Sequence, residues 1–283
     1  MDDNAGRDRA AWPWRAVASA AAAAVVLGGC GSGDDDKSAE PSPSASSRSS
    51  APAASGSSSS PSSTGGDAKT LTPFRADPAQ VPRTKAQAEA LAAAVALGPE
   101  AWGADFRAQR PAASTARTVA VLDEQCRWER RPLPKGVLAS LSRYSELPGA
   151  GGKGEIKVTA AVTVHTTVLD ADDQLSTTLE EPLRCREQQV RTDERISELM
   201  STGNVYGQGN NTYSDDQVVE IGSYLTGTAK QKYFWFVTRL GTVTLAVSVK
   251  GAEGYTESEL NTYASQATST MLGRVEFELG GKN

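Results

Sequence analysis

Three carboxylates gather in one short stretch of the sequence, after a loop rich in glycine and asparagine. Asp215 and Asp216 are adjacent, and Glu220 follows four residues later. Such groups can coordinate calcium or act as a general acid and base in hydrolysis. The Asp-x-Asp-x-Asp-Gly spacing of a calcium loop is missing, and adjacent aspartates in a loop usually point apart. The stretch therefore favours ligand binding, with a hydrolase that uses these carboxylates as the alternative.

The chain has a single histidine, His165, and serine–histidine–aspartate machinery would depend on it. This residue lies in a run of alternating valines and threonines that predicts a strand, and no Gly-x-Ser-x-Gly elbow occurs in the sequence. A zinc site of imidazoles needs more than one histidine. We expect His165 to face a helix or solvent, and we expect no catalytic residue, metal or cofactor.

Aromatic residues offer a second kind of ligand site. Tyr224 shares a strand face with Glu220, and an aromatic ring beside a carboxylate on an open sheet face is typical of ligand-binding surfaces. Other residues that could line such a groove are Trp102, Trp128, Trp235, Tyr206, Tyr213 and Tyr233. Packing in the core is the competing interpretation. The ligand-binding candidates are therefore Asp215, Asp216, Glu220 and Tyr224.

Cys30 offers covalent chemistry. Arg7, Arg9 and Arg15 precede an apolar run that ends in Leu27-Gly28-Gly29-Cys30. A basic start, a short apolar stretch and small residues before a cleavage point are typical of a secretory signal, and the run is shorter than the roughly 20 residues of a bilayer-spanning helix. The last four residues resemble the bacterial lipobox. This resemblance implies diacylglycerol on Cys30 and cleavage before it; an ordinary signal with a chance cysteine is the alternative.

The stretch after Cys30 is predicted to be a disordered tether. Residues 31–69 are mostly Ser, Pro, Ala, Gly and Asp, a composition that cannot bury enough apolar surface to offset the entropy of ordering. A chain of this length would span roughly 35 Å root-mean-square. We therefore divide the sequence into a signal peptide (1–29), a lipidated cysteine with its linker (30–69) and an extracellular domain (70–283).

Charge and cysteine content narrow the class of protein further. The chain carries 29 Lys and Arg against 34 Asp and Glu, a net charge of −5, without the basic patch that nucleic-acid binding needs. Cys126 and Cys185 remain once Cys30 carries lipid, and an even pair in an exported chain predicts a disulfide. Such a bond would stabilise the fold by about 4 kcal/mol.

The pattern of apolar residues predicts an α+β fold, with a mixed or antiparallel sheet and helices packed on its faces. Helices are expected after the capping residues Thr84 and Thr256 and from Asp170, with Pro182 ending or kinking the last of these. Gly273 is expected to end the C-terminal helix. Strands are expected at 119–122, 125–130, 137–147, 155–169, 217–226, 232–240, 242–250 and 275–279, and the strand at 232–240 is expected to be central. Residues 191–198 are read as a polar segment.

Several stretches resemble a group of Streptomyces-type actinobacterial lipoproteins of unassigned function and, more distantly, the extracellular sensor domains of mycobacterial serine/threonine kinases. The resemblance rests on Val121-Leu122-Asp123-Glu124-Gln125-Cys126-Arg127-Trp128, Leu138-Ala139-Ser140, Cys185, Arg195-Ile196 and the stretch from Tyr233-Phe234-Trp235 to Leu245. It implies an α+β module with a cleft that binds something in the envelope. This chain has one cysteine pair in that region where the kinase group has two.

The sequence thus leads us to expect a lipoprotein held on the outer face of the cell membrane by diacylglycerol on Cys30. Its folded domain is expected to be non-catalytic and to bind a ligand or a protein partner of the envelope. A cell-wall hydrolase and a purely structural envelope protein are the alternatives.

Overall fold

The computed structural model describes residues 73–280, which are nearly all of the expected extracellular domain. The signal peptide, Cys30 and the linker lie outside the described residues. Within residues 73–280, no helix has both the length and the apolar composition that a membrane span requires.

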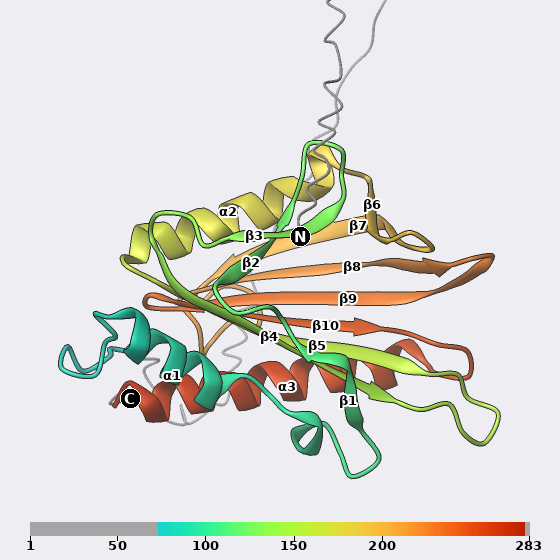
Figure 1. The fold of residues 1–283 in the computed structure, drawn as a ribbon, viewed down its shortest axis with the longest axis horizontal. Helices are drawn as coiled ribbons and strands as arrows, with labels where there is room; N and C mark the ends of the chain where they lie inside the picture. The colour runs from blue at the N-terminus through green and yellow to red at the C-terminus, as the bar shows by residue number, and fades with distance from the viewer. Residues whose placement is uncertain (1–72, 281–283) are drawn as a thin grey trace, which may run out of the picture. The chain divides into compact units, whose positions relative to one another are not determined.

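An antiparallel sheet of eight strands forms the frame of the domain (Figure 1). From one edge to the other its strands are β1 (Arg107–Ala113), β4 (Val137–Leu147), β5 (Ile156–His165), β10 (Val243–Lys250), β9 (Ala229–Leu240), β8 (Asp216–Thr226), β7 (Glu194–Val205) and β6 (Glu187–Arg191). A separate hairpin consists of β2 (Thr118–Leu122) and β3 (Trp128–Pro132). Since helices cover the sheet, the predicted α+β class is confirmed.

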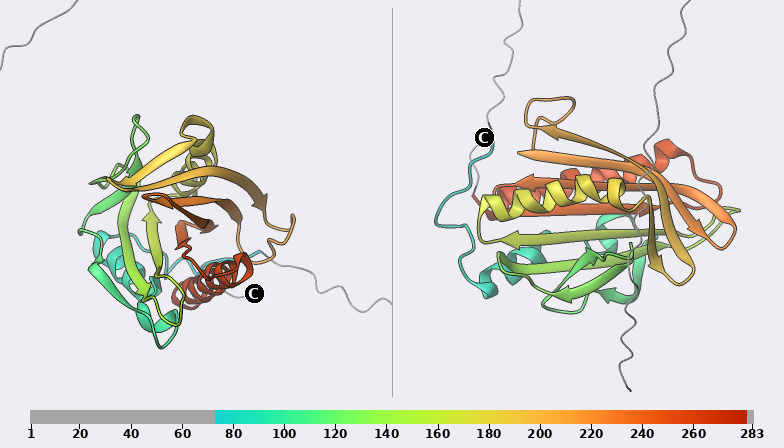
Figure 2. Two further views of the ribbon diagram at one scale, coloured as in Figure 1. Left: turned by 90° about the vertical axis from the view of Figure 1, so that its right-hand side faces the viewer. Right: turned by 90° about the horizontal axis from the view of Figure 1, so that it is seen from above.

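Helices lie on both faces of the sheet. The helices α1 (Lys85–Val95) and α3 (Glu257–Glu278) pack on one face, which we call the outer face, while α2 (Val168–Arg184) packs on the opposite, inner face (Figure 1). A short 3₁₀ helix, η1 (Pro99–Ala101), follows α1. Each α-helix begins at a threonine whose side chain accepts the N–H of the third helical residue, a capping box that satisfies donors at the helix end. The sheet is curled, as the end-on view in Figure 2 shows.

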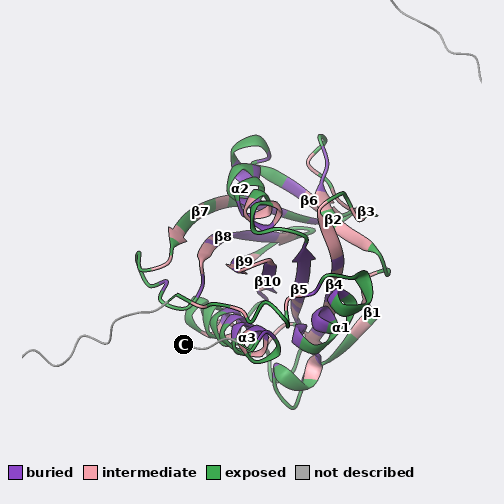
Figure 3. Ribbon diagram, turned by 90° about the vertical axis from the view of Figure 1, so that its left-hand side faces the viewer, coloured by how far each residue is buried: buried purple, intermediate pink, exposed green. Residues whose placement is uncertain are grey.

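The main apolar core lies between the outer face and the helices α1 and α3 (Figure 3). In β5, five residues at alternate positions are completely buried there: Ile156, Val158, Ala160, Val162 and Val164. Alternate side chains of a strand point to opposite faces, so the residues between them lie on the inner face. The inner face carries two much smaller apolar clusters: Leu175, Val218, Val237 and Ala246 form one, and Ile196, Tyr224 and Tyr233 form the other. Stability therefore comes mainly from one side of the sheet.

Several predicted elements are confirmed. The strand predicted at 137–147 is β4 without any change of bounds, and the predicted disulfide joins Cys126 to Cys185. The apolar strand β9 lies between β10 and β8, near the middle of the sheet. The predicted capping residues Thr84 and Thr256 do begin α1 and α3.

Other predicted bounds are wrong. Gly273 does not end α3, which continues to Glu278, so the strand predicted at 275–279 does not exist. Val275 and Leu279 are buried one helical turn apart, whereas Phe277 is 83% exposed. The strand β5 ends at His165, and α2 begins at Val168, two residues before the predicted Asp170, which instead completes the capping box.

The sequence analysis also missed strands. The polar segment 191–198 contains the end of β6 and the start of β7, and the edge strand β1 is not among the predicted strands. These strands are rich in polar side chains, so their sequences lack the clear alternation of apolar and polar residues that predicts a strand.

Candidate ligand-binding cavity

A cavity of about 710 Å³ lies on the inner face of the sheet. Its floor is built from β5 and β10, where three successive cross-strand pairs are small: Thr159 with Ser248, Ala161 with Ala246, and Thr163 with Thr244. Ala161 is only half-buried, although its strand has hydrogen-bonded neighbours on both sides. These side chains are too short to fill the space above them, so a cavity remains over the middle of the sheet.

Two elements form the roof of this cavity. One is α2, which contributes Gln174, Thr178 and Glu181; the other is the β2–β3 hairpin, which contributes Val121 and Trp128. Cys126 in the hairpin turn is bonded to Cys185 at the end of α2, so the disulfide joins the two roof elements. The bond thereby fixes the hairpin above the floor.

The hairpin is also tied to strands on two sides of the sheet. On one side, the N–H of Gln189 in β6 donates to the carbonyl of Cys126 at 2.8 Å, and Trp128 Nε1 donates to Gln188 Oε1 at 2.8 Å. On the other side, Arg130 Nη1 donates to Ser142 Oγ of β4 at 3.4 Å. The hairpin therefore bridges the cavity from β6 to β4.

The hairpin turn is shaped by its own sequence. Asp123 Oδ1 accepts the backbone N–H groups of Gln125 and Arg127 at 2.9 and 2.8 Å. A short carboxylate that accepts backbone donors a few residues ahead stabilises a tight turn. The hydrogen bond from the Arg127 backbone is the main reason why the pKa of Asp123 is lowered. The turn holds Cys126 in place for the disulfide.

Three of the aromatic residues considered in the sequence line this cavity. Trp128 comes from the hairpin, while Trp235 and Tyr233 come from β9. The indole rings of Trp128 and Trp235 lie 6.2 Å apart at 55°, one from the roof and one from the floor. Trp102 belongs instead to the core on the outer face, and Tyr213 is exposed in a loop. The cavity thus has an aromatic wall with a small, hydroxyl-rich floor beside it.

At one end of the cavity, three cationic side chains surround the carboxylate of Glu194. Lys250 Nζ lies 2.9 Å from Oε2, while Lys157 Nζ and Arg191 Nη1 lie 3.4 and 3.3 Å from Oε1. Burial alone would raise the pKa of Glu194, but the three cations, Lys250 first, lower it to about 2. Burial lowers the pKa of Lys250. All three cations line the cavity.

His165 marks the other end. Its Nε2 lies 2.9 Å from Gln174 Oε1 of α2, which also accepts the hydroxyl of Thr244 at 2.6 Å. The residue is 3% exposed, and burial lowers its pKa despite the hydrogen bond to Gln174. His165 therefore faces a helix, as predicted. It connects β5, β10 and α2.

A pair of buried acids lies between α2 and β8, with Glu181 on the helix and Glu220 on the strand. Burial and the nearby Glu220 carboxyl raise the pKa of Glu181 to about 8, against the opposing effect of Arg184. Burial raises the pKa of Glu220 to about 7, although Ser201 donates to it at 2.8 Å. Glu181 lines the cavity and is 8% exposed. At neutral pH it is therefore a largely uncharged carboxyl group that can donate to a ligand.

The four ligand-binding candidates lie outside the lining of this cavity. Glu220 and Tyr224 do share the inner face of β8, but both are buried, at 3% and 6% exposed. Tyr224 lies under Lys250, whose ammonium is 5.1 Å from the ring centroid, and burial raises the pKa of Tyr224 to about 12. Both residues are therefore buried beside the cavity, and Tyr224 packs against Lys250 of its lining.

Asp215 and Asp216 pair with a single arginine. Arg239 Nη1 lies 3.1 Å from Asp215 Oδ2, and the same guanidinium forms a further ion pair with Asp216. Asp215 also accepts the N–H of Gly241 at 2.7 Å, which ties the β9–β10 turn to the start of β8. These contacts give both carboxylates a structural role.

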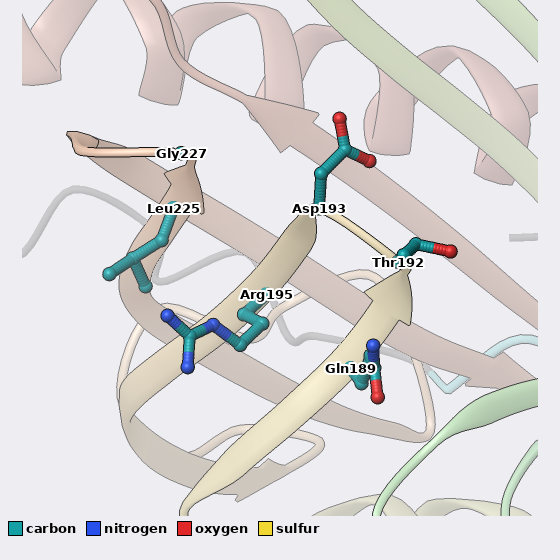
Figure 4. A pocket seen from close by; sticks show the side chains of 6 residues that line it. All are labelled: Gln189, Thr192, Asp193, Arg195, Leu225 and Gly227. Carbon is teal, nitrogen blue, oxygen red and sulfur yellow. The ribbon is translucent and has the colours of Figure 1, made fainter.

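A smaller depression of about 320 Å³ lies near the turns that end β6 and β8 (Figure 4). Arg195 and Asp193 both border it, but their charged groups point in different directions in Figure 4. No set of polar groups converges there. Among residues 73–280, no group of three or more His, Cys, Asp or Glu side chains is placed to hold a metal ion.

The sequence analysis found the floor of the cavity without identifying it. Lys157, Thr159, Thr163 and His165 alternate with apolar residues, a pattern that predicts a half-buried strand with one polar face. β10 carries the same signal, with Thr244, Ser248 and Lys250 at alternate positions. Two adjacent strands with small polar residues on one face were the available sign of a cavity. Glu181 and Glu194 gave no comparable signal, because their burial depends on contacts distant in sequence.

Comparison with models of known protein families finds no match, and a search of curated proteins finds none either.

Proposed function

We propose that this chain is a lipid-anchored lipoprotein of the cell envelope whose extracellular domain binds a small molecule without transforming it. The observation that carries the binding proposal is the cavity on the inner face of the sheet. At about 710 Å³ it falls within the range of about 300–1,000 Å³ typical of small-molecule sites. Its lining combines aromatic and small apolar residues with a few polar groups at each end, as such sites usually do.

The disulfide supports the proposed location outside the cell. Cys126 and Cys185 form a bond that fixes the roof of the cavity, and such bonds persist mainly in oxidising compartments. The sequence resemblance to envelope lipoproteins and to kinase sensor domains supports the same proposal, because proteins of either group carry a domain outside the membrane. Of the functions considered, a sensor-like binding protein therefore fits best.

The anchor is tested by replacing one residue. In cells that make the protein, Cys30→Ser removes the sulfur that would carry the diacylglycerol. We expect the wild type in the membrane fraction and the variant released or uncleaved, as measured by fractionation and the mass of the mature N-terminus. Equal distribution of the two proteins would contradict the anchor.

The cavity is tested by filling it. Ala161→Phe places a ring above the floor of the cavity, where the native side chain is small and only half-buried. Ala108→Phe makes the same change at an exposed position of the edge strand β1 and is the control. After incubation with an envelope extract and desalting, wild type and control should retain a small molecule, detected by mass spectrometry, that Ala161→Phe loses. Equal retention by all three would contradict the proposed site.

A further inference from the structure

The end of the cavity near Glu194 contains more positive than negative charge. Lys157, Lys250 and Arg191 all approach the Glu194 carboxylate within 3.4 Å. One further carboxylate is close, Glu155, which lies 3.8 Å from Lys157 Nζ and is exposed. Three cations thus face two carboxylates, in a chain whose net charge is −5.

These cations keep unused hydrogen-bond donors. Lys250 is the most buried of them, with its side chain 13% exposed, and it makes the shortest contact with Glu194. Lys157 and Arg191 have side chains 28% and 53% exposed and make longer contacts with Glu194. A lysine has three donors and an arginine five, so both have N–H groups left for a further anion.

An apolar surface begins directly beside this charged end. The next residues along the inner face of β9 and β5 are Trp235, Thr159 and Ala161, and Val121 of the hairpin lies in the roof. The opposite end, near His165, carries Asp170 and Asp173 together with Lys135, whose neighbour Gly136 lies against the Asp170 carboxylate. The cavity therefore has a basic end beside an apolar middle, and this order would orient an elongated ligand.

We propose that the cavity binds an amphipathic anion, with its phosphate or carboxylate group at Lys157, Arg191 and Lys250 and its apolar part between Trp235, Ala161 and the β2–β3 hairpin. This inference rests on the proposed binding function and specifies the chemical class of the ligand. Charge-assisted hydrogen bonds from lysine and arginine are strong and suit such head groups. The apolar middle gives affinity through surface removed from water.

Three probes separate the contributions of head group and chain: decyl phosphate, decanol and inorganic phosphate. Their binding to the full mature chain is measured by isothermal titration calorimetry. Decyl phosphate should bind at least about 10-fold more tightly than either of the others, because only it uses both the basic end and the apolar middle. Tight binding of inorganic phosphate alone would replace this inference with a site for the free ion.

Charge variants then place the head group. Lys157→Gln and Arg191→Gln should each weaken decyl phosphate about 10-fold and leave decanol unchanged, since each removes one charge-assisted bond. Lys230→Gln is the matched control, because Lys230 pairs with Glu198 away from the cavity and is exposed. Circular dichroism checks that each variant is folded. Ala161→Phe should abolish binding of both alkyl probes.

The possible outcomes separate this inference from the proposed function. If decanol binds as tightly as decyl phosphate, or if the two charge variants behave like Lys230→Gln, the anion site is wrong, whereas cavity binding stands. If no probe binds, the inference is also wrong, and the proposed function is judged by retention of a molecule from the envelope extract. If Ala161→Phe binds decyl phosphate like the wild type, binding occurs outside the cavity and both proposals fail.

Discussion

Two buried glutamates of the inner face illustrate how position decides the state of a residue. Glu194 is surrounded by three cations and has a pKa of about 2, whereas Glu181 is buried on α2 near another carboxyl and has a pKa of about 8. The same residue type is thus ionised in one place and largely protonated in the other at neutral pH. Nothing in the local sequence distinguishes them, because the groups responsible are brought together by the fold.

Glu181 predicts a pH dependence of stability. Its pKa is about 8 in the folded chain against an ordinary 4.5, so the folded state binds the proton more tightly. The free energy of unfolding should therefore fall as the pH rises from about 4.5 to about 8, as linkage requires. Glu181→Gln cannot ionise and should gain stability relative to the wild type across this range. We expect the difference to change by on the order of 1 kcal/mol or more between pH 5 and pH 8.5 in urea titrations.

The neighbouring Glu180→Gln is the control for this experiment. Glu180 is on the same helix but exposed, so its replacement should leave the pH profile as it is. Glu220 is present in both wild type and Glu181→Gln and titrates in the same direction in each. The difference between their two pH profiles of unfolding free energy therefore reports on Glu181. A gap between Glu181→Gln and wild type that stays constant with pH would show that Glu181 is ionised in the folded chain.

At the scale of elements, much of the fold was predictable from spacing alone. The alternation in β5 and the capping boxes at Thr84 and Thr256 are local signals, and the structure contains all of them. The C-terminal segment was not predictable in this way. Val275, Phe277 and Leu279 fit a strand by alternation, but Val275 and Leu279 also fit one helical face, and packing of α3 against the outer face favours the helix. Burial by distant elements decides such ambiguous segments.

Gly273 allows a direct test of that correction. It lies inside α3, and a Cβ added there would meet nothing within 4 Å. Gly273→Ala should therefore stabilise the domain by about 0.5–1 kcal/mol, the difference in helix propensity. Chemical denaturation measures it. In Gly222→Ala, by contrast, the added Cβ would lie 2.7 Å from the Ser197 carbonyl oxygen, so this variant should be destabilised. A loss of stability in Gly273→Ala would favour a helix that ends at this residue.

The candidate site was less predictable than the fold. The aromatic residues Trp128, Trp235 and Tyr233 are candidates from the sequence, and they do line the cavity. The proposed carboxylates Asp215 and Asp216 pair with Arg239, which lies near the end of the following strand, 23 residues after Asp216. An ion pair of this kind depends on the register of β8 and β9, which the sequence does not specify.

At the scale of the whole molecule, the two faces of the sheet have different roles. The outer face buries the large apolar side chains against α1 and α3 and provides most of the stability. The inner face carries small and polar residues and is bridged by a hairpin that a disulfide attaches to α2. This division leaves space inside a stable domain, as the proposed binding function requires.

The most direct measurement of the central claim is a crystal structure of the described domain after incubation with an envelope extract. The account predicts added electron density in the cavity, bounded by Ala161 and Trp235 on the floor and by α2 and the hairpin above, with any anionic group beside Lys157. Density for a retained molecule at another surface, or a cavity closed by α2 or the hairpin, would contradict it.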